Sequence, residues 1–367
     1  MSEISFDKPN SQAEPRLKFI DLARALAILL MLEGHFVGEA LGERGQYAEH
    51  PVYRAWNFVR GFTAPLFFTV AGMIFTYLLG AETEPRFLKR KRVRKGLRRA
   101  GELLLWGYAL QLSASRIQSY VQLDFPAWAS AFHVLQCIGI GLVALLVIAA
   151  IRHRIGGLAL AWWYVGACAA TLALYIWLRQ MPETQYVPAG WPQIIQNAIR
   201  GPHSVFPLAP WLAFVFLGGA IGDCIRIFRG KLQTPLSCLW FFALAAVLEV
   251  LRAAVFSFPY LDDATVFGLT WFTSRAAQVV AFIGLLCWVE TMWGIGFPRL
   301  LVVGRLTFEI YIIHVIILYG MVIGIGLNDW ISGKLGPWQA TLGAAIFILF
   351  FLILAQFIDA WKSRKRT

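Results

Sequence analysis

The feature that most constrains this chain is a succession of apolar stretches, each of roughly 20 residues, which is the length a helix needs to cross a bilayer. The chain is 58% hydrophobic and 15% charged. Soluble domains carry about a quarter of their residues as charged side chains. A soluble protein of this size would therefore lack the polar surface that covers a core. The sequence predicts an all-α, polytopic membrane protein.

Gly and Pro residues mark several limits of these stretches, as at Pro126, Pro207, Pro298 and Pro337. We predict about ten transmembrane helices. Their expected ranges are 17–40, 57–80, 96–118, 127–151, 156–178, 207–228, 236–256, 267–293, 301–326 and 338–361. The expected organisation is a polar tail over residues 1–16, a membrane domain over 17–361 and a basic tail over 362–367.

The net charge of +12 is concentrated in alternate connections, above all in the basic run between residues 86 and 99. Loops rich in Lys and Arg stay on the cytoplasmic side of a membrane. This pattern places both termini in the cytoplasm and the chain in the cytoplasmic (inner) membrane, in contact with membrane lipids. Because no soluble basic domain is present, the charge does not indicate binding to nucleic acid.

The five cysteines form no Cys-x-x-Cys pair and fall mostly within apolar stretches. They are expected to be small buried hydrophobic residues, without a metal site or a disulfide framework. The motif His-Glu-x-x-His is absent, which argues against a metalloprotease.

Many ionisable residues fall inside the expected spans, where each costs a few kcal/mol unless it faces the protein interior. One interpretation is a solvated polar cavity that crosses much of the bilayer. The alternative is a set of structural ion pairs, such as Glu249 with Arg252 or Arg305 with Glu309, at helical spacings of three and four.

The first span carries the most informative pair, Arg24 and His35. Eleven residues at about 100° each amount to three turns plus about 20°, so both side chains point the same way, roughly 16 Å apart along the helix. Arginine suits a phosphate-bearing ligand, and histidine suits proton transfer near neutral pH. Glu39 lies one turn beyond His35 and is a candidate to orient it, whereas Glu33 lies on nearly the opposite face. The alternative for His35 is a hydrogen bond within the bundle.

Several segments resemble a known superfamily of membrane acyltransferases. The segment Asp21-Leu-Ala-Arg24 followed by His35 resembles the R-x10-H first helix of the acyltransferase-3 family, although Ala25 replaces the usual glycine. Residues 60–72 are similar to the second helix of heparan-α-glucosaminide N-acetyltransferase-like bacterial proteins. Residues 133–139 and 304–314 are similar to later elements. The matches follow the family's order over about 300 residues of the chain.

The resemblance implies transfer of an acyl group, often acetyl, from cytoplasmic acyl-coenzyme A to a hydroxyl or amine of an extracytoplasmic glycan or lipid-linked acceptor. We assign candidate roles accordingly. The catalytic candidates are His35, His314 and Glu39. The candidates for binding the donor acyl-coenzyme A are Arg24, Asp21 and Arg305. The candidates for binding the acceptor or an oxyanion are Arg60, His133, Gln136 and Arg275, whose structural alternative is interhelical hydrogen bonding. No metal is expected.

Two other classes of function remain open. A transporter or exporter of an anionic or glycan substrate also uses buried charges, but the chain shows no clear inverted repeat. A non-catalytic scaffold would not need Arg24 or His35. The acceptor, the acyl chain, O- versus N-transfer, an acyl-histidine intermediate and the oligomeric state are not determined by the sequence. Trp128 and Trp191 suit either sugar stacking or membrane-interface anchoring.

Overall fold

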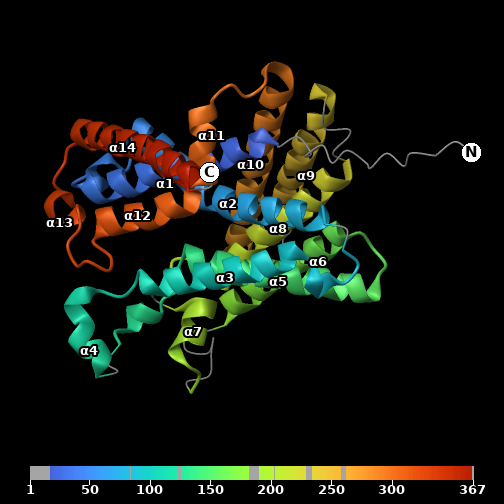
Figure 1. Cartoon of the computed structure of the whole chain (residues 1–367), viewed down its shortest axis with the longest axis horizontal. Coiled ribbons are helices and arrows are strands. Elements are labelled where there is room, and N and C mark those ends of the chain that lie inside the picture. The colour runs from blue at the N-terminus through green and yellow to red at the C-terminus, as the bar shows by residue number, and fades with distance from the viewer. Residues whose placement is uncertain are drawn as a thin grey trace, which may run out of the picture.

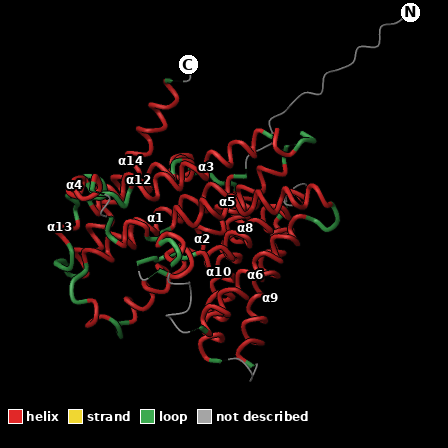
Figure 2. Tube along the Cα trace, turned by 90° about the horizontal axis from the view of Figure 1, so that it is seen from below, coloured by secondary structure: helices red, strands yellow, loops and turns green. Residues whose placement is uncertain are grey.

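The computed structural model describes residues 17–82, 84–122, 125–181, 190–201, 203–228, 234–257 and 262–365. These residues are almost entirely helical, and Figure 2 shows no strand among them. The long helices are α1 Lys18–Ala40, α2 Pro51–Gly80, α3 Lys91–Ala109, α5 Val134–Ile155, α6 Leu160–Gln180, α8 Leu208–Phe228, α9 Leu239–Phe256, α10 Asp263–Trp293, α12 Thr307–Tyr319 and α14 Pro337–Arg364. The shorter helices are α4 Ile117–Val121, α7 Gln193–Arg200, α11 Pro298–Arg305 and α13 Asn328–Ile331.

Seven helices of the described chain are long and apolar enough to cross a membrane. The pair α11 and α12, bent by 74°, adds an eighth if the two are counted as one span. The all-α, polytopic membrane class is therefore confirmed. The prediction of ten also needs α1 and α3, which carry too many charged residues to be counted on length and apolarity alone. The predicted tail over residues 1–16 lies outside the described residues.

Proline and glycine set several helix limits as predicted. Helices α11 and α14 begin at Pro298 and Pro337, and α5 ends before Gly156. Proline is favourable in the first turn because its missing N–H has no helical partner there. Helix α14 continues to Arg364, so the predicted limit at residue 361 falls within its last turn.

Several predicted limits are off by a few residues, as for the span 57–80, which begins at Pro51, and two spans differ more. The span 96–118 begins earlier, at Lys91, and ends at Ala109, because Gln111 turns inward to donate to the carbonyls of Gly107 and Ala131. The span 301–326 is broken at Leu306 and ends at Tyr319. The break separates Arg305 from Glu309, so the helical ion pair suggested for them does not exist.

The two residues instead bind the last helix. Arg305 donates to Asp359 at 3.2 Å, and Glu309 accepts from Lys362. The other suggested pair is confirmed, since Arg252 Nε donates to Glu249 at 2.5 Å on the regular helix α9. Helical spacing predicts a pair only where the helix is continuous.

Helices α1, α12 and α14 lie together at one end of the molecule, and α3 packs beside α5 (Figure 1). Helix α2 packs on α1 and also on α8. Helices α6 and α9 expose most of their apolar side chains, as expected of helices that face lipid. The centre of the bundle is thus built around α1, α2 and α8.

Candidate active site

A cavity of about 270 Å³ lies between α1, α2, α3, α5 and α12, and we call it the inner cavity after the predicted orientation of α1. Arg24 enters it from α1, donates to the Thr307 hydroxyl at 2.8 Å and lies 4.0 Å from the Asp21 carboxylate. Arg99 enters it from α3 and stacks 3.7 Å above the ring of Phe308. The cavity is lined by Arg24, Ala27, Phe67, Val70, Ala71, Ile74, Phe75, Leu78, Arg99, Leu103, Leu135, Ile138, Leu142, Thr307, Phe308 and Tyr311. Two guanidinium groups therefore reach one largely apolar space.

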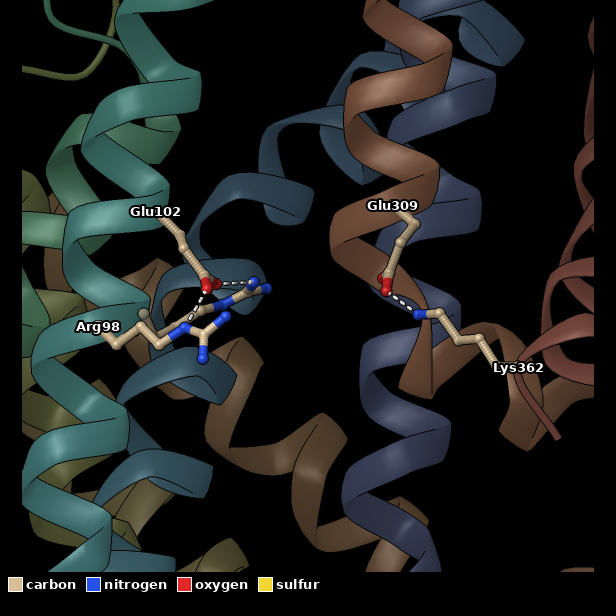
Figure 3. A network of polar contacts seen from close by, with 5 residues as sticks. Arg98, Glu102, Glu309 and Lys362 are labelled. Atoms are coloured by element: carbon tan, nitrogen blue, oxygen red, sulfur yellow. Dashed lines mark hydrogen bonds and ion pairs between the residues drawn. The ribbon is translucent and has the colours of Figure 1, made fainter. Parts of the chain in front are cut away.

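Further charged side chains lie on α3 and α12, close in sequence to the cavity residues Arg99 and Phe308. Figure 3 shows Glu102 paired with Arg98 on α3, and Glu309 paired with Lys362 from α14. Arg99 also contacts Glu102, at 3.3 Å. Glu102 and Glu309 are thus already paired with basic partners, and Asp21 is the acidic group that lies beside Arg24.

A second cavity, of about 220 Å³, is lined by residues of α1, α2, α5 and α12, and we call it the outer cavity. It holds His35 from α1 and Arg60 and Thr63 from α2. Val205 and Phe206, from the connection between α7 and α8, also line it. The lining residues are Leu30, Met31, Gly34, His35, Arg60, Thr63, Ala64, Phe67, Val134, Val205, Phe206 and Tyr311.

The two cavities share Phe67 and Tyr311. Along α1 the lining passes from Arg24 and Ala27 in the inner cavity to His35 in the outer one. The prediction that Arg24 and His35 lie on one face of α1 is therefore confirmed. The expectation of one polar cavity is wrong: the structure has two mainly apolar cavities that meet at a pair of aromatic rings, because many of the charged side chains pair with one another instead.

His35 and His314 form a direct contact. His35 Nδ1 lies 3.0 Å from His314 Nε2, and the ring centroids are 5.2 Å apart. His314 is fully buried, and the ring of Tyr311 packs edge-on against it at 5.1 Å. Because one nitrogen of each ring is committed to this contact, only Nε2 of His35 is left to act on a molecule in the outer cavity.

Arg60 lies in a cradle formed by α1 and its own helix. A Cβ atom at Gly34 would lie 3.3 Å from Arg60 Cγ, and one at Gly38 would lie 3.3 Å from Nη2. On the other side, the guanidinium lies 5.4 Å from the centre of the Trp56 ring, and Trp56 Nε1 donates to Glu33 at 2.6 Å. The side chain thus runs from the level of His35 toward the end of α1.

Three other candidates lie close to these groups without lining either cavity. His314 contacts His35, as described. Asp21 is buried beside Arg24. Glu39 follows one turn after His35, but the structure joins His35 Nδ1 to His314, so Glu39 does not orient that nitrogen.

The remaining candidates have other contacts. Arg275 donates to the Phe58 carbonyl at 3.0 Å and to Gln278, which ties α10 to α2. His133 and Gln136 form the N-terminal cap of α5. Arg305 pairs with Asp359. None of these four lines the described cavities, and their contacts account for them as interhelical or capping residues.

The sequence did not single out Thr63, Phe67, Tyr311 or Arg99, nor the Glu33–Trp56 pair. For α2 a signal was present: Arg60, Thr63, Phe67 and the inner residues Ala71 and Ile74 recur at spacings of three and four and share one helix face. For Glu33 and Trp56 no local signal exists, because they lie on different helices, and the place of Arg99 at the cavity depends on Phe308 of α12.

No group of three His, Cys, Asp or Glu side chains that suits a metal ion occurs in the described part of the chain. The chemistry available at the site is that of a guanidinium pair, an imidazole pair and hydroxyl groups.

The sequence matches the family described as heparan-alpha-glucosaminide N-acetyltransferase, catalytic, over residues 16–247. The match covers well over half of the chain. It includes Arg24, His35, Arg60 and Thr63, whereas His314 and Tyr311 lie beyond it. A search among proteins of curated function gave no match.

Proposed function

Because the chain belongs to the heparan-α-glucosaminide N-acetyltransferase family, a family of membrane acetyltransferases, we propose that it transfers acetyl from cytoplasmic acetyl-coenzyme A. The acceptor in this proposal is an amine or hydroxyl of a glycan or lipid-linked molecule on the other side of the membrane. One observation carries it: Arg24 and His35 line two cavities that meet at Phe67 and Tyr311.

The donor enters by the inner cavity. Coenzyme A is strongly anionic, and the planar, permanently charged guanidinium of Arg24 suits its phosphates. Arg99 adds a second guanidinium to the same cavity, and Asp21 and Thr307 orient Arg24. The apolar walls then accept the linear arm that carries the thioester.

The thioester end passes between Phe67 and Tyr311. Arg24 and His35 lie roughly 16 Å apart along α1, so a donor held at Arg24 must reach past this aromatic pair. In this proposal the two rings move apart to join the cavities, since Phe67 and Tyr311 line both of them. With the arm in place, the rings close around it and keep water from the outer cavity.

The transfer itself uses His35. In this mechanism His35 carries its proton on Nδ1 and donates a hydrogen bond to His314 Nε2, 3.0 Å away, which leaves the lone pair on His35 Nε2 for the acceptor. The acceptor nitrogen or oxygen attacks the thioester carbonyl carbon, and His35 Nε2 takes its proton. The new C–N or C–O bond forms, the C–S bond breaks, and the imidazolium returns the proton to the coenzyme A sulfur.

The orientation in this proposal keeps both termini and the Arg24 side in the cytoplasm, with ten spans once α1 and α3 are counted. Two contacts support a shared side for several ends. Glu290, near the end of α10, accepts from the backbone N–H groups of Lys18 and Phe19 at the start of α1. Lys362, near the end of α14, binds Glu309 at the start of α12. Labelling of single cysteines placed at residues 92 and 330 by an impermeant reagent tests the orientation.

The direct test is release of coenzyme A by the purified protein. With acetyl-coenzyme A and glucosamine, or a panel of amino sugars and lipid-linked sugars, we expect acceptor-dependent release that is lost in His35→Ala. Wild-type turnover in His35→Ala would remove His35 from the chemistry. Uptake of a substrate by vesicles without any release of coenzyme A would favour the transporter instead.

A further inference from the structure

We infer that the hydroxyl of Thr63 is a catalytic group, which donates a hydrogen bond to the thioester carbonyl oxygen as negative charge develops on it. This inference rests on the proposed function and adds a residue to it. Acyl transfer needs such a donor because the attacked carbonyl becomes an oxyanion. His35 accepts a proton from the acceptor and cannot supply this hydrogen bond at the same moment.

Thr63 brings a buried hydroxyl to the outer cavity, whose lining also includes Tyr311. The side chain of Thr63 is only 8% exposed, and it lines the same space of about 220 Å³ as His35. That space is smaller than the ~300–1,000 Å³ of pockets that enclose whole ligands. A thioester carbonyl within it therefore lies close to both side chains, one from α1 and one from α2.

The Thr63 hydroxyl has no hydrogen-bond partner among the described residues. Threonines in helices commonly donate to the carbonyl three or four residues earlier. Thr171, Thr270, Thr273 and Thr341 all do so in this chain. A buried hydroxyl without a partner costs free energy, which a ligand oxygen in the cavity would recover.

The unpaired hydroxyl alone would not carry the inference, because Thr69 on the same helix also lacks a partner among the described residues. Thr69 is fully buried, and its backbone carbonyl oxygen lies against α8, where it would contact a Cβ at Gly218. Thr69 lines neither described cavity. The combination of an unpaired hydroxyl and a cavity shared with the base is what distinguishes Thr63.

Arg60 does not fill this role equally well. Its guanidinium lies beside Gly38, about one helical turn beyond His35 on α1. The donor arrives from the opposite direction, past Ala27. Arg60 is therefore on the acceptor's side of the base, while Thr63 lies between Arg60 and Phe67 along α2.

The experiment compares Thr63→Val with Thr69→Val. Valine keeps the shape of threonine and removes the hydroxyl, and loss of an unpaired hydroxyl does not destabilise a protein. We expect Thr63→Val to lower kcat about 100-fold, within the range for loss of one oxyanion donor. The KM for acetyl-coenzyme A stays unchanged, Thr63→Ser recovers most of kcat, and Thr69→Val keeps the wild-type kcat.

A second measurement does not depend on the acceptor. The carbonyl stretch of bound [1-¹³C]acetyl-coenzyme A, recorded by infrared difference spectroscopy, should lie at higher frequency in Thr63→Val than in the wild type. Unchanged kcat and an unchanged stretch in Thr63→Val, in a protein that transfers acetyl, overturn the assignment of Thr63 alone. Failure of the wild type to bind acetyl-coenzyme A would overturn the proposed function as well as this assignment.

Discussion

Glycines serve opposite purposes at the two faces of α2, where this helix meets α8 and α1. On the face toward α8, Gly72, Gly218 and Gly222 bring backbone against backbone, so that a Cβ at Gly218 would lie 1.9 Å from the Thr69 carbonyl oxygen. On the face toward α1, Gly34 and Gly38 make room for the long side chain of Arg60. Glycine on one side closes the interface, and on the other side it leaves space for a charged group.

The helical repeat explains how one helix supports both. At about 100° per residue, Thr63, Phe67 and Ala71 lie within about 60° of Arg60, while Thr69 and Met73 lie on the opposite side. Small residues allow close approach of helices in membranes. Packing density, and not residue type, therefore distinguishes the two faces of α2. We call them the scaffold face (Thr69, Gly72, Met73) and the site face (Arg60, Thr63, Phe67).

The largest effect is expected on the scaffold face, from Gly218→Ala. The added Cβ has no space against the Thr69 carbonyl, and overpacking of this kind costs about 3 kcal/mol. Thermal unfolding in detergent should show a clear drop in Tm. Gly166→Ala on α6 is the control, because nothing lies within 4 Å of a Cβ there. An unchanged Tm in Gly218→Ala would contradict the close packing of α2 on α8.

The second-largest effect is expected at the candidate active site, from His314→Leu on α12. Loss of the acceptor for His35 Nδ1–H removes the orientation of the base, and we expect kcat to fall about 100-fold. The Tm should change little, because leucine fills the buried volume. His153→Leu, at the end of α5, is the matched control. Full activity in His314→Leu would mean that the contact between the two rings is structural only.

A smaller effect is expected from Arg24→Lys. The charge remains, but the planar fork that donates to Thr307 and suits a phosphate is lost. The KM for acetyl-coenzyme A should rise about tenfold with kcat unchanged, which corresponds to ~1.4 kcal/mol. Arg54→Lys, in an exposed pair with Glu49, controls for the exchange itself. A fall in kcat with an unchanged KM would move Arg24 away from donor binding.

A weaker effect is expected from Gly34→Ala, which reduces the space that α1 leaves for Arg60 at the site face of α2. The new Cβ would lie 3.3 Å from Arg60 Cγ, a contact that a flexible side chain relieves by a small shift. We expect about a threefold loss in kcat/KM for the acceptor and no loss of stability, since alanine favours helix by ~1 kcal/mol. Gly101→Ala, with open space around it, should leave kcat/KM unchanged. A large loss of stability in Gly34→Ala would make the two faces of α2 alike.

The smallest effect is expected at the N-terminal cap of α10, which belongs to neither face of α2. The hydroxyl and the backbone N–H of Thr265 donate to Asp262 and lower the pKa of its carboxyl below the usual 3.8. A lowered pKa stabilises the fold above the normal value, and this contribution is lost as the pH falls through the lowered one. The Tm of the wild type should therefore decline slightly more than that of Asp262→Asn below pH 4. Equal profiles would exclude this contribution.

The sequence predicted the class of fold because length and apolarity decide it, and it predicted the common face of Arg24 and His35 because that face lies within one regular helix. The pairing of Arg305 with Glu309 failed because the helix breaks at Leu306. The meeting of His35 with His314 joins residues 279 positions apart, so no local pattern encodes it. Thr63 and Thr69 are both buried threonines of α2, and only the cavity beside Thr63 sets it apart.

In the proposed mechanism the two cavities form one route from Arg24 to His35. A structure with a non-reactive thioether analogue of acetyl-coenzyme A is the most direct test of this route. We expect phosphate density at Arg24, a continuous arm between Phe67 and Tyr311, and the acetyl-mimicking end between His35 and Thr63. An analogue that binds with its thioether end on the Arg24 side of a closed Phe67–Tyr311 pair, or whose phosphates lie away from Arg24, would show that the donor does not take this route.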